Sequence, residues 1–176
     1  MMIPAVLLTL AAIAPTPAND PTKSVIAVEL RTAMPVVKSG ELPRFTAEVV
    51  NRSNKEIVLV RPGDGSDCGW RTPVLSWMVE GVKPQRLARC GNINALKPNE
   101  VFLLKPGERA SLGEWIGFPR LPGPGTYTVR LRFENKPDLK WSGLPLGKHD
   151  EAAMARVKAS TPAAAESNAV RIIVRE

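Results

Sequence analysis

Few side chains in this sequence could carry chemistry. His149 is the single histidine among the 176 residues, so a Ser-His-Asp or Cys-His catalytic device would have to use it. Its neighbours Lys148, Asp150 and Glu151 are typical of the start of a helix, and no nucleophile-elbow motif accompanies it. We therefore interpret His149 as an exposed residue at a helix start and expect that the protein is not an enzyme.

Two carboxylates, Asp64 and Asp67, lie three residues apart in a glycine-rich stretch. A calcium site needs six or more oxygen ligands, and the spacing and terminal glutamate of an EF-hand are missing. A phosphate-binding loop would continue into Gly-Lys-Ser/Thr and a helix, which this stretch does not. With one histidine, and without closely paired cysteines, a zinc site is not expected either. We predict an Asx/Gly turn here, with no metal and no cofactor.

Tryptophans offer a possible binding surface. Trp77 alternates with Leu75 and Val79 and is expected in the core, as is Trp115. The other two lie in long Pro/Gly-rich stretches, residues 61–73 and 135–148, beside charged and hydroxyl groups that would let a ring stack on a sugar or hold a peptide. The alternative is that these rings pack the loops onto the domain. The candidate ligand-binding residues are Asp64, Asp67, Trp70, Arg71 and Trp141.

The N-terminus resembles an export signal. Residues 3–14 form an apolar run too short to span a bilayer, followed by Pro15-Thr16-Pro17-Ala18. This pattern predicts a signal peptide over 1–18 and one mature domain over 19–176, secreted or periplasmic. No basic residue precedes the run and Pro4 interrupts it, so a disordered N-terminus or a misassigned start is the alternative. No cysteine lies near the cleavage site, and no later apolar run is long enough to span a bilayer. We therefore expect no membrane anchor.

An oxidising compartment would favour a disulfide between the two cysteines, Cys68 and Cys90. The loop of about 20 residues that such a bond closes corresponds to roughly 3 kcal/mol in the chain-entropy account. If the protein is not exported, two reduced buried thiols become the favoured interpretation. The disulfide prediction therefore depends on the signal-peptide prediction.

The formal net charge is +7 and the isoelectric point is near 9.8. Such a balance permits attraction to nucleic acid, anionic lipid or acidic envelope polymers. The basic residues are scattered, however, and the alternating pairs Arg130/Arg132 and Arg171/Arg175 are typical of the solvated face of a strand. We interpret the charge as a contribution to solubility and expect no nucleic-acid partner.

Period-two alternation indicates many short strands. The clearest begins after a Pro/Gly turn at Leu121–Gly125 and places Tyr127, Val129, Leu131 and Phe133 on one face. Asp150 and Glu151 begin a short predicted helix that ends before Thr161-Pro162, and Ala163–Ala165 is interpreted as linker. The sequence shows no strand-helix-strand alternation, which is the pattern that would favour a parallel sheet. Further strands are predicted at residues 22–32, 44–49, 57–60, 75–79, 86–90, 101–104, 110–115 and 170–174.

Two blocks resemble bacterial immunoglobulin-like domains. They are Ala47–Leu59, a strand-Asn-x-Ser-strand hairpin, and Leu104–Glu108 followed by Pro124–Val129. Their order is also similar to that of the BsuPI-like proteinase inhibitors. The resemblance implies an all-β, antiparallel immunoglobulin-like β-sandwich in which the Tyr127 hydroxyl bonds to upstream backbone, as in a tyrosine corner. Antibody domains carry a Cys where Val129 stands here, so their inter-sheet bridge does not carry over.

These features together predict an exported, non-enzymatic and monomeric module of the cell envelope that binds an unknown protein or an envelope polymer. Binding is expected to use the long loops, because loops on a rigid sandwich are where recognition usually occurs. Two alternatives remain open. One is a proteinase inhibitor that presents an exposed loop, and the other is a carbohydrate-binding module that uses Trp70 and Trp141.

Overall fold

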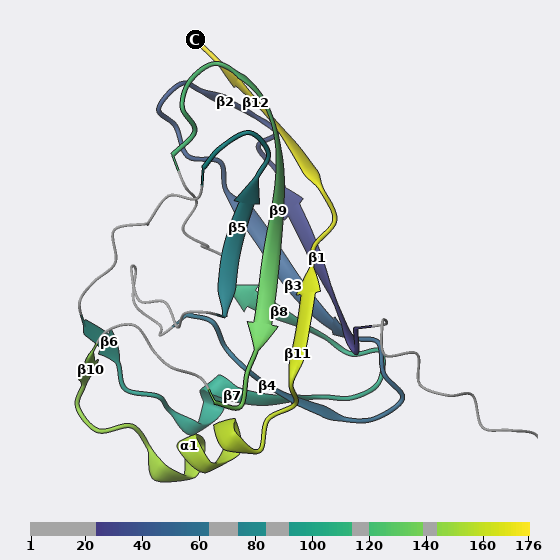
Figure 1. Ribbon diagram of the computed structural model, residues 1–176, viewed down its shortest axis with the longest axis vertical. Coiled ribbons are helices and arrows are strands. Elements are labelled where there is room, and N and C mark those ends of the chain that lie inside the picture. The colour runs from purple at the N-terminus through teal and green to yellow at the C-terminus, as the bar shows by residue number, and fades with distance from the viewer. Residues whose placement is uncertain (1–23, 64–73, 84–91, 114–119, 139–143) are drawn as a thin grey trace, which may run out of the picture.

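The protein is mainly β, with one short helix near its C-terminus (Figure 1). The structure, a computed structural model, describes residues 24–63, 74–83, 92–113, 120–138 and 144–176. Half of these residues lie in strands. The elements are β1 (Ile26–Thr32), β2 (Val36–Lys38), β3 (Phe45–Asn51), β4 (Ile57–Val60), β5 (Leu75–Val79), β6 (Asn92–Asn94), the 3₁₀ turn η1 (Pro98–Glu100), β7 (Val101–Leu104), β8 (Arg109–Gly113), β9 (Gly125–Asn135), β10 (Leu144–Leu146), α1 (Glu151–Lys158), β11 (Ala163–Glu166) and β12 (Val170–Arg175).

One sheet has the strand order β1-β3-β8 and is antiparallel throughout. The sequence alternation explains its two faces. In β1 every second residue from Ile26 to Leu30 is buried, and in β3 the same holds from Phe45 to Val49. The intervening residues, mostly charged or hydroxylated, form the outer face.

The second sheet is organised around β9, the longest strand. One edge of β9 pairs with β5, and the other pairs first with β12 and then with β11, all antiparallel. Beyond β12 lies β2, which pairs in parallel, and β6 and β10 form a separate parallel pair. The prediction of a purely antiparallel protein is therefore wrong at these short strands, which the sequence analysis did not find.

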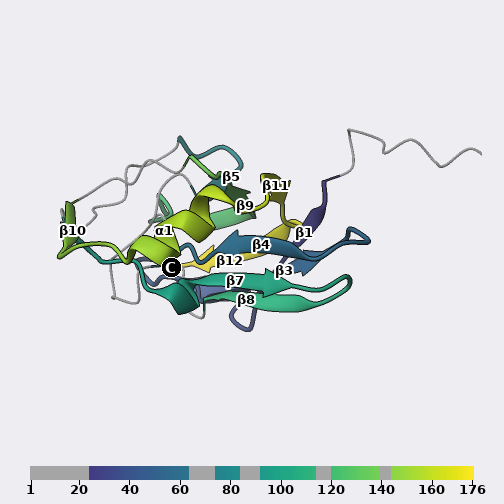
Figure 2. The ribbon, with the colours of Figure 1, turned by 90° about the horizontal axis from the view of Figure 1, so that it is seen from below.

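The two sheets share one core. In Figure 1, β5, β9 and β11 lie in front of β1, β3 and β8, and the view in Figure 2 separates the two groups. Val129, Leu131 and Phe133 of β9 are fully buried, as the alternation predicts. Trp77 of β5 is half-buried against this core, with its ring centroid 4.9 Å from that of Phe45.

A smaller apolar cluster lies under helix α1. The β4–β7 pair contributes Val60 and Val101, the helix contributes Ala153 and Val157, and Leu96 completes the set. The helix begins where the sequence predicts, because the Asp150 carboxylate accepts a 2.7 Å hydrogen bond from the Ala153 amide.

Tyr127 makes the hydrogen bond that the resemblance implies. Its hydroxyl donates to the Gly123 carbonyl oxygen at 2.8 Å, and its half-buried ring packs against the main core. The turn before β9 is thereby fastened to the strand that follows it. This interaction fixes where β9 starts.

The segment Ala163–Ala165 is strand β11, so its interpretation as linker is wrong. Alanine has a low intrinsic preference for strands. However, β12 pairs only with the first half of β9, so the same edge of the second half of β9 is open to β11.

The residues between β11 and β12 bond to both sheets. The Ser167 hydroxyl accepts from the Leu131 amide at 2.9 Å. The Asn168 side chain accepts from the Leu30 amide at 2.8 Å and donates to the Leu30 carbonyl at 3.0 Å. Asn168 thus joins the two sheets.

A cross-strand charge cluster covers the outer face of the β1-β3-β8 sheet. Glu29 and Glu48 are directly opposite each other, an arrangement that repels unless it is neutralised. Arg109 lies 2.7 Å from Glu29 and 3.5 Å from Glu48, and Arg31 lies 2.8 Å from Glu29. The hydrogen bond from Arg109 is the largest cause that lowers the pKa of Glu29 below its ordinary value of 4.5, against an opposing effect of burial.

Replacing Tyr127 by Phe tests the bond to Gly123. The ring and its burial remain while one hydrogen bond is lost, so we expect the free energy of unfolding to fall by about 1 kcal/mol. Urea denaturation measures this change. Tyr127→Leu, which also removes ring contacts, should cost more; an unchanged free energy of unfolding in Tyr127→Phe would contradict a role for the hydroxyl.

Acid titration tests the Glu29 cluster. Because the folded-state pKa of Glu29 is depressed, its pairing stabilises the fold above pH 4.5, and this contribution is lost as the pH falls through the folded-state pKa. Arg109→Gln should raise the pKa of Glu29, measured by NMR of its carboxyl carbon. The stability difference from the wild type should be largest near neutral pH and shrink below pH 4.5. Arg175→Gln, on the other sheet, should leave the Glu29 titration unchanged.

Candidate functional site

The residues predicted to bind a ligand lie outside the described part of the chain. This holds for Asp64, Asp67, Trp70, Arg71 and Trp141, and also for the predicted disulfide partners Cys68 and Cys90. The structure does place the residues at which these segments begin and end. Their positions show whether the two predicted binding loops start from one region of the molecule.

The two long loops begin side by side. The first follows β4 and the second follows β9, and the side-chain oxygen of Asn135 accepts a 2.9 Å hydrogen bond from the Val60 amide. The first loop also ends here, because the Val74 carbonyl accepts a 2.8 Å hydrogen bond from the Glu134 amide. We call the end of the molecule where Val60, Val74 and Asn135 lie the loop end.

Asn135 is the residue that holds this arrangement. It is 1% exposed, and its side-chain nitrogen donates to the Ser160 hydroxyl at 2.9 Å and to the Thr161 carbonyl at 2.8 Å. One carboxamide therefore connects the end of β9, the end of β4 and the segment that leaves α1. Asn135, predicted from the sequence to be the first residue of the loop, is the last residue of β9.

The β6–β10 pair brings two further segment ends together. Asn92, the first described residue after 84–91, is the register partner of Leu144, the first after 139–143. In Figure 1 the pair lies at the left edge of the molecule, where β10 leads into helix α1. The described ends of the segments that contain Cys90 and Trp141 are thus neighbours.

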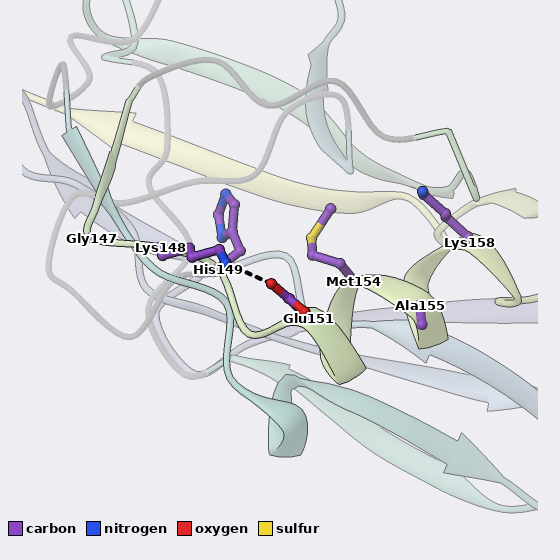
Figure 3. Close-up of a pocket in the computed structure, with 7 residues that line it drawn as sticks. All are labelled: Gly147, Lys148, His149, Glu151, Met154, Ala155 and Lys158. Atoms are coloured by element: carbon purple, nitrogen blue, oxygen red, sulfur yellow. Dashed lines mark hydrogen bonds and ion pairs between the residues drawn. The ribbon is translucent and has the colours of Figure 1, made fainter.

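A groove of about 510 Å³ lies along α1 at the same end (Figure 3). This volume falls within the roughly 300–1,000 Å³ of small-ligand sites. The His149 ring and the Met154 side chain project from the same side of the segment in Figure 3. The lining residues are Gly147, Lys148, His149, Glu151, Met154, Ala155 and Lys158.

His149 is half-buried, so its interpretation as an exposed residue is wrong. Its Nδ1 atom accepts a 2.9 Å hydrogen bond from the Leu96 amide, and the Leu96 carbonyl accepts from the Asp150 amide at 3.2 Å. Because Nδ1 is the acceptor, the neutral ring carries its proton on Nε2. The ring therefore fastens the start of α1 to the segment before η1 while it lines the groove.

The charged groups of the groove favour an anionic group weakly. Lys148 pairs with Glu151 at 2.5 Å, but both side chains are 82% exposed, where such pairs contribute little. Lys158 forms no ion pair with another described residue and lies in the last turn of α1, where a cation suits the helix dipole. With one carboxylate against two ammonium groups, the groove carries a small positive charge.

Within the described ranges no three His, Cys, Asp or Glu side chains gather in a way that could hold a metal ion. No helix in those ranges has the length and apolarity to cross a bilayer. No protein-family model, curated protein or solved structure matches the chain. Function is therefore inferred from the geometry of the loop end.

Replacing Asn135 by Ala should loosen the loop end. The buried Val60 amide and the part-buried Thr161 carbonyl would each lose a partner, and such a loss costs about 1–3 kcal/mol for a buried group. We expect the unfolding free energy to fall by about 2–4 kcal/mol and the Val60 amide to exchange faster with deuterium. Asn54→Ala, at an exposed turn, should change neither quantity. Unaltered exchange at Val60 in the Asn135 variant would contradict the assignment.

Proposed function

We propose that this protein is an exported, non-enzymatic binding module of the cell envelope that contacts its ligand with the loop end. The observation that carries the proposal is the Asn135–Val60 hydrogen bond, since it joins the ends of β4 and β9, after which the two predicted binding loops begin. Recognition residues are often placed on loops that a rigid scaffold positions. Under this proposal Trp70, Arg71 and Trp141 contact the ligand.

We propose an immunoglobulin-like β-sandwich as the scaffold. Two observations support it: the sheets around β3 and β9 share one core, and Tyr127 makes the backbone bond of a tyrosine corner. The parallel β2–β12 and β6–β10 pairs would be additions to that plan. The leader over 1–18 and a Cys68–Cys90 bridge belong to the same proposal, because an exported domain can keep a disulfide.

The ligand class that the groove favours is an anionic envelope polymer. Lys158 and Lys148 supply cations along α1, and Met154 with the His149 ring supplies apolar surface between them. The formal charge of +7 would assist the approach of such a polymer. Tryptophan rings on the adjoining loops could stack on its sugars.

Retention on immobilised envelope polymer tests the proposal. Trp70→Ala and Trp141→Ala should each weaken binding by roughly 2 kcal/mol if they are hot-spot residues. Lys158→Ala should weaken it less and reduce its dependence on salt. The control is Lys55→Ala, an exposed lysine in the β3–β4 turn, which should bind like the wild type.

Three outcomes would contradict the proposal. The first is that Trp70→Ala and Trp141→Ala bind as well as the wild type. The second is that Lys55→Ala weakens binding as much as Lys158→Ala, and the third is that no envelope polymer retains the protein.

Incubation with a panel of proteases tests the inhibitor alternative. Inhibition of a protease with protection or cleavage of one exposed loop would support that alternative in place of polymer binding.

A further inference from the structure

Three Lys-x-x-Glu turns in the chain share one hydrogen-bond pattern. In each, the Glu carboxylate accepts from the Lys backbone amide: Glu41 from Lys38 at 2.9 Å, Glu100 from Lys97 at 2.7 Å and Glu108 from Lys105 at 2.8 Å. In each, the Glu amide also donates to the Lys carbonyl, at 3.0, 3.1 and 3.0 Å respectively. Both backbone groups of the lysine are therefore occupied by a residue three positions later.

Two of these turns follow edge strands. The Lys38–Glu41 turn ends β2, and the Lys105–Glu108 turn follows β7. Both have glycine at the third position with positive φ, +88° at Gly40 and +76° at Gly107, as a type II turn requires. The third turn coincides with η1 and has no strand before it, because Lys97 follows an irregular segment.

The hydrogen bonds of β2 show which groups face its open edge. The Pro35 carbonyl accepts from Ile173 and the Ser39 amide donates to Arg175, so alternate groups at 35, 37 and 39 face β12. The groups of Val36 and Lys38 face the other way. Since Glu41 occupies both groups of Lys38, only Val36 presents an amide and a carbonyl without a partner among the described residues.

Strand β7 repeats this arrangement. The Arg61 amide donates to the Glu100 carbonyl, which places the groups at 100, 102 and 104 toward β4 and those at 101, 103 and 105 away from it. The Val101 amide bonds to the Pro98 carbonyl, and Glu108 occupies both groups of Lys105. Leu103 is then the residue whose amide and carbonyl both face the open edge.

The residue left on each edge is apolar and exposed. Val36 is 40% exposed and Leu103 is 45% exposed, and Met34 and Leu42 beside β2 are also exposed. An exposed apolar edge strand pairs readily with another chain, and proteins block such edges with charges or proline. Pro35 precedes Val36, and a glutamate follows each of the two strands.

We propose that Glu41 and Glu108 keep β2 and β7 from pairing with a second copy of this chain. Strand addition needs a run of alternate amides and carbonyls, and each carboxylate reduces that run to one residue. Without Glu41, the Lys38 amide would be free and would form one continuous edge with the amide and carbonyl of Val36. Two such edges could then pair antiparallel and bury Val36 and its apolar neighbours. This inference is independent of the ligand at the loop end.

Sedimentation of the full-length protein over a series of concentrations tests the proposal. Glu41→Ala and Glu108→Ala should show a weight-average mass that at least doubles as concentration rises, while the wild type keeps one mass. Glu41→Gln, whose side-chain oxygen can still accept the Lys38 amide, should behave like the wild type. Glu100→Ala is the control, because it removes the same bond from Lys97, which lies outside any strand.

A further variant separates edge pairing from poor folding. Val36→Lys in the Glu41→Ala background places a charge on the exposed edge and should restore a single mass. Circular dichroism confirms that each variant is folded. The proposal is overturned if folded Glu41→Ala and Glu108→Ala keep the wild-type mass, if Glu100→Ala associates equally, or if Val36→Lys restores nothing.

Discussion

The structure depends on asparagine side chains that replace backbone partners where the chain leaves a sheet. A carboxamide carries one acceptor and one donor group, as a peptide does, so it can satisfy backbone that no strand reaches. Asn51, fully buried, donates to the Lys55 and Leu104 carbonyls where the chain passes from β3 to β4. Asn135 does the same at the end of β9, and Asn168 pairs with Leu30 between the sheets.

These positions are constrained more strongly than the apolar core around them. A buried valine can be exchanged for another apolar residue of similar volume at a modest cost, whereas a buried amide or carbonyl left unpaired costs its full desolvation. The hydrogen bonds of these asparagines also set the arrangement of the strands, because a side chain bonded to two strands fixes their relative position. The ends of β4 and β9, after which the two long loops begin, are joined in this way by Asn135.

The sequence predicts the strands that alternate over several residues, such as β1, β3 and β9, and the helix that begins after Asp150. It does not predict β2, β6 and β10, because three residues carry no period, nor β11, because Ala163–Ala165 becomes a strand only through the free edge of β9. The role of Asn135 could not be predicted from the sequence either, since its hydrogen-bond partners come from segments far apart in the chain. The groove residues Met154 and Lys158 were missed because the tertiary packing of α1, not helix propensity, decides which of its side chains line a surface.

The edges and the loop end impose opposite requirements on this fold. A protein built of several sheets presents backbone at its edge strands, and here glutamate side chains after β2 and β7, together with Thr161 beside β4, occupy much of it. At the loop end, the bonds of Asn135 and the Glu134–Val74 backbone bond join the ends of the strands. A surface that must recognise a ligand benefits from this combination, because fixed loop origins lower the entropy lost on binding while the loop sequences remain able to vary. Closed edges would then leave the loop end as the surface for the binding that we propose.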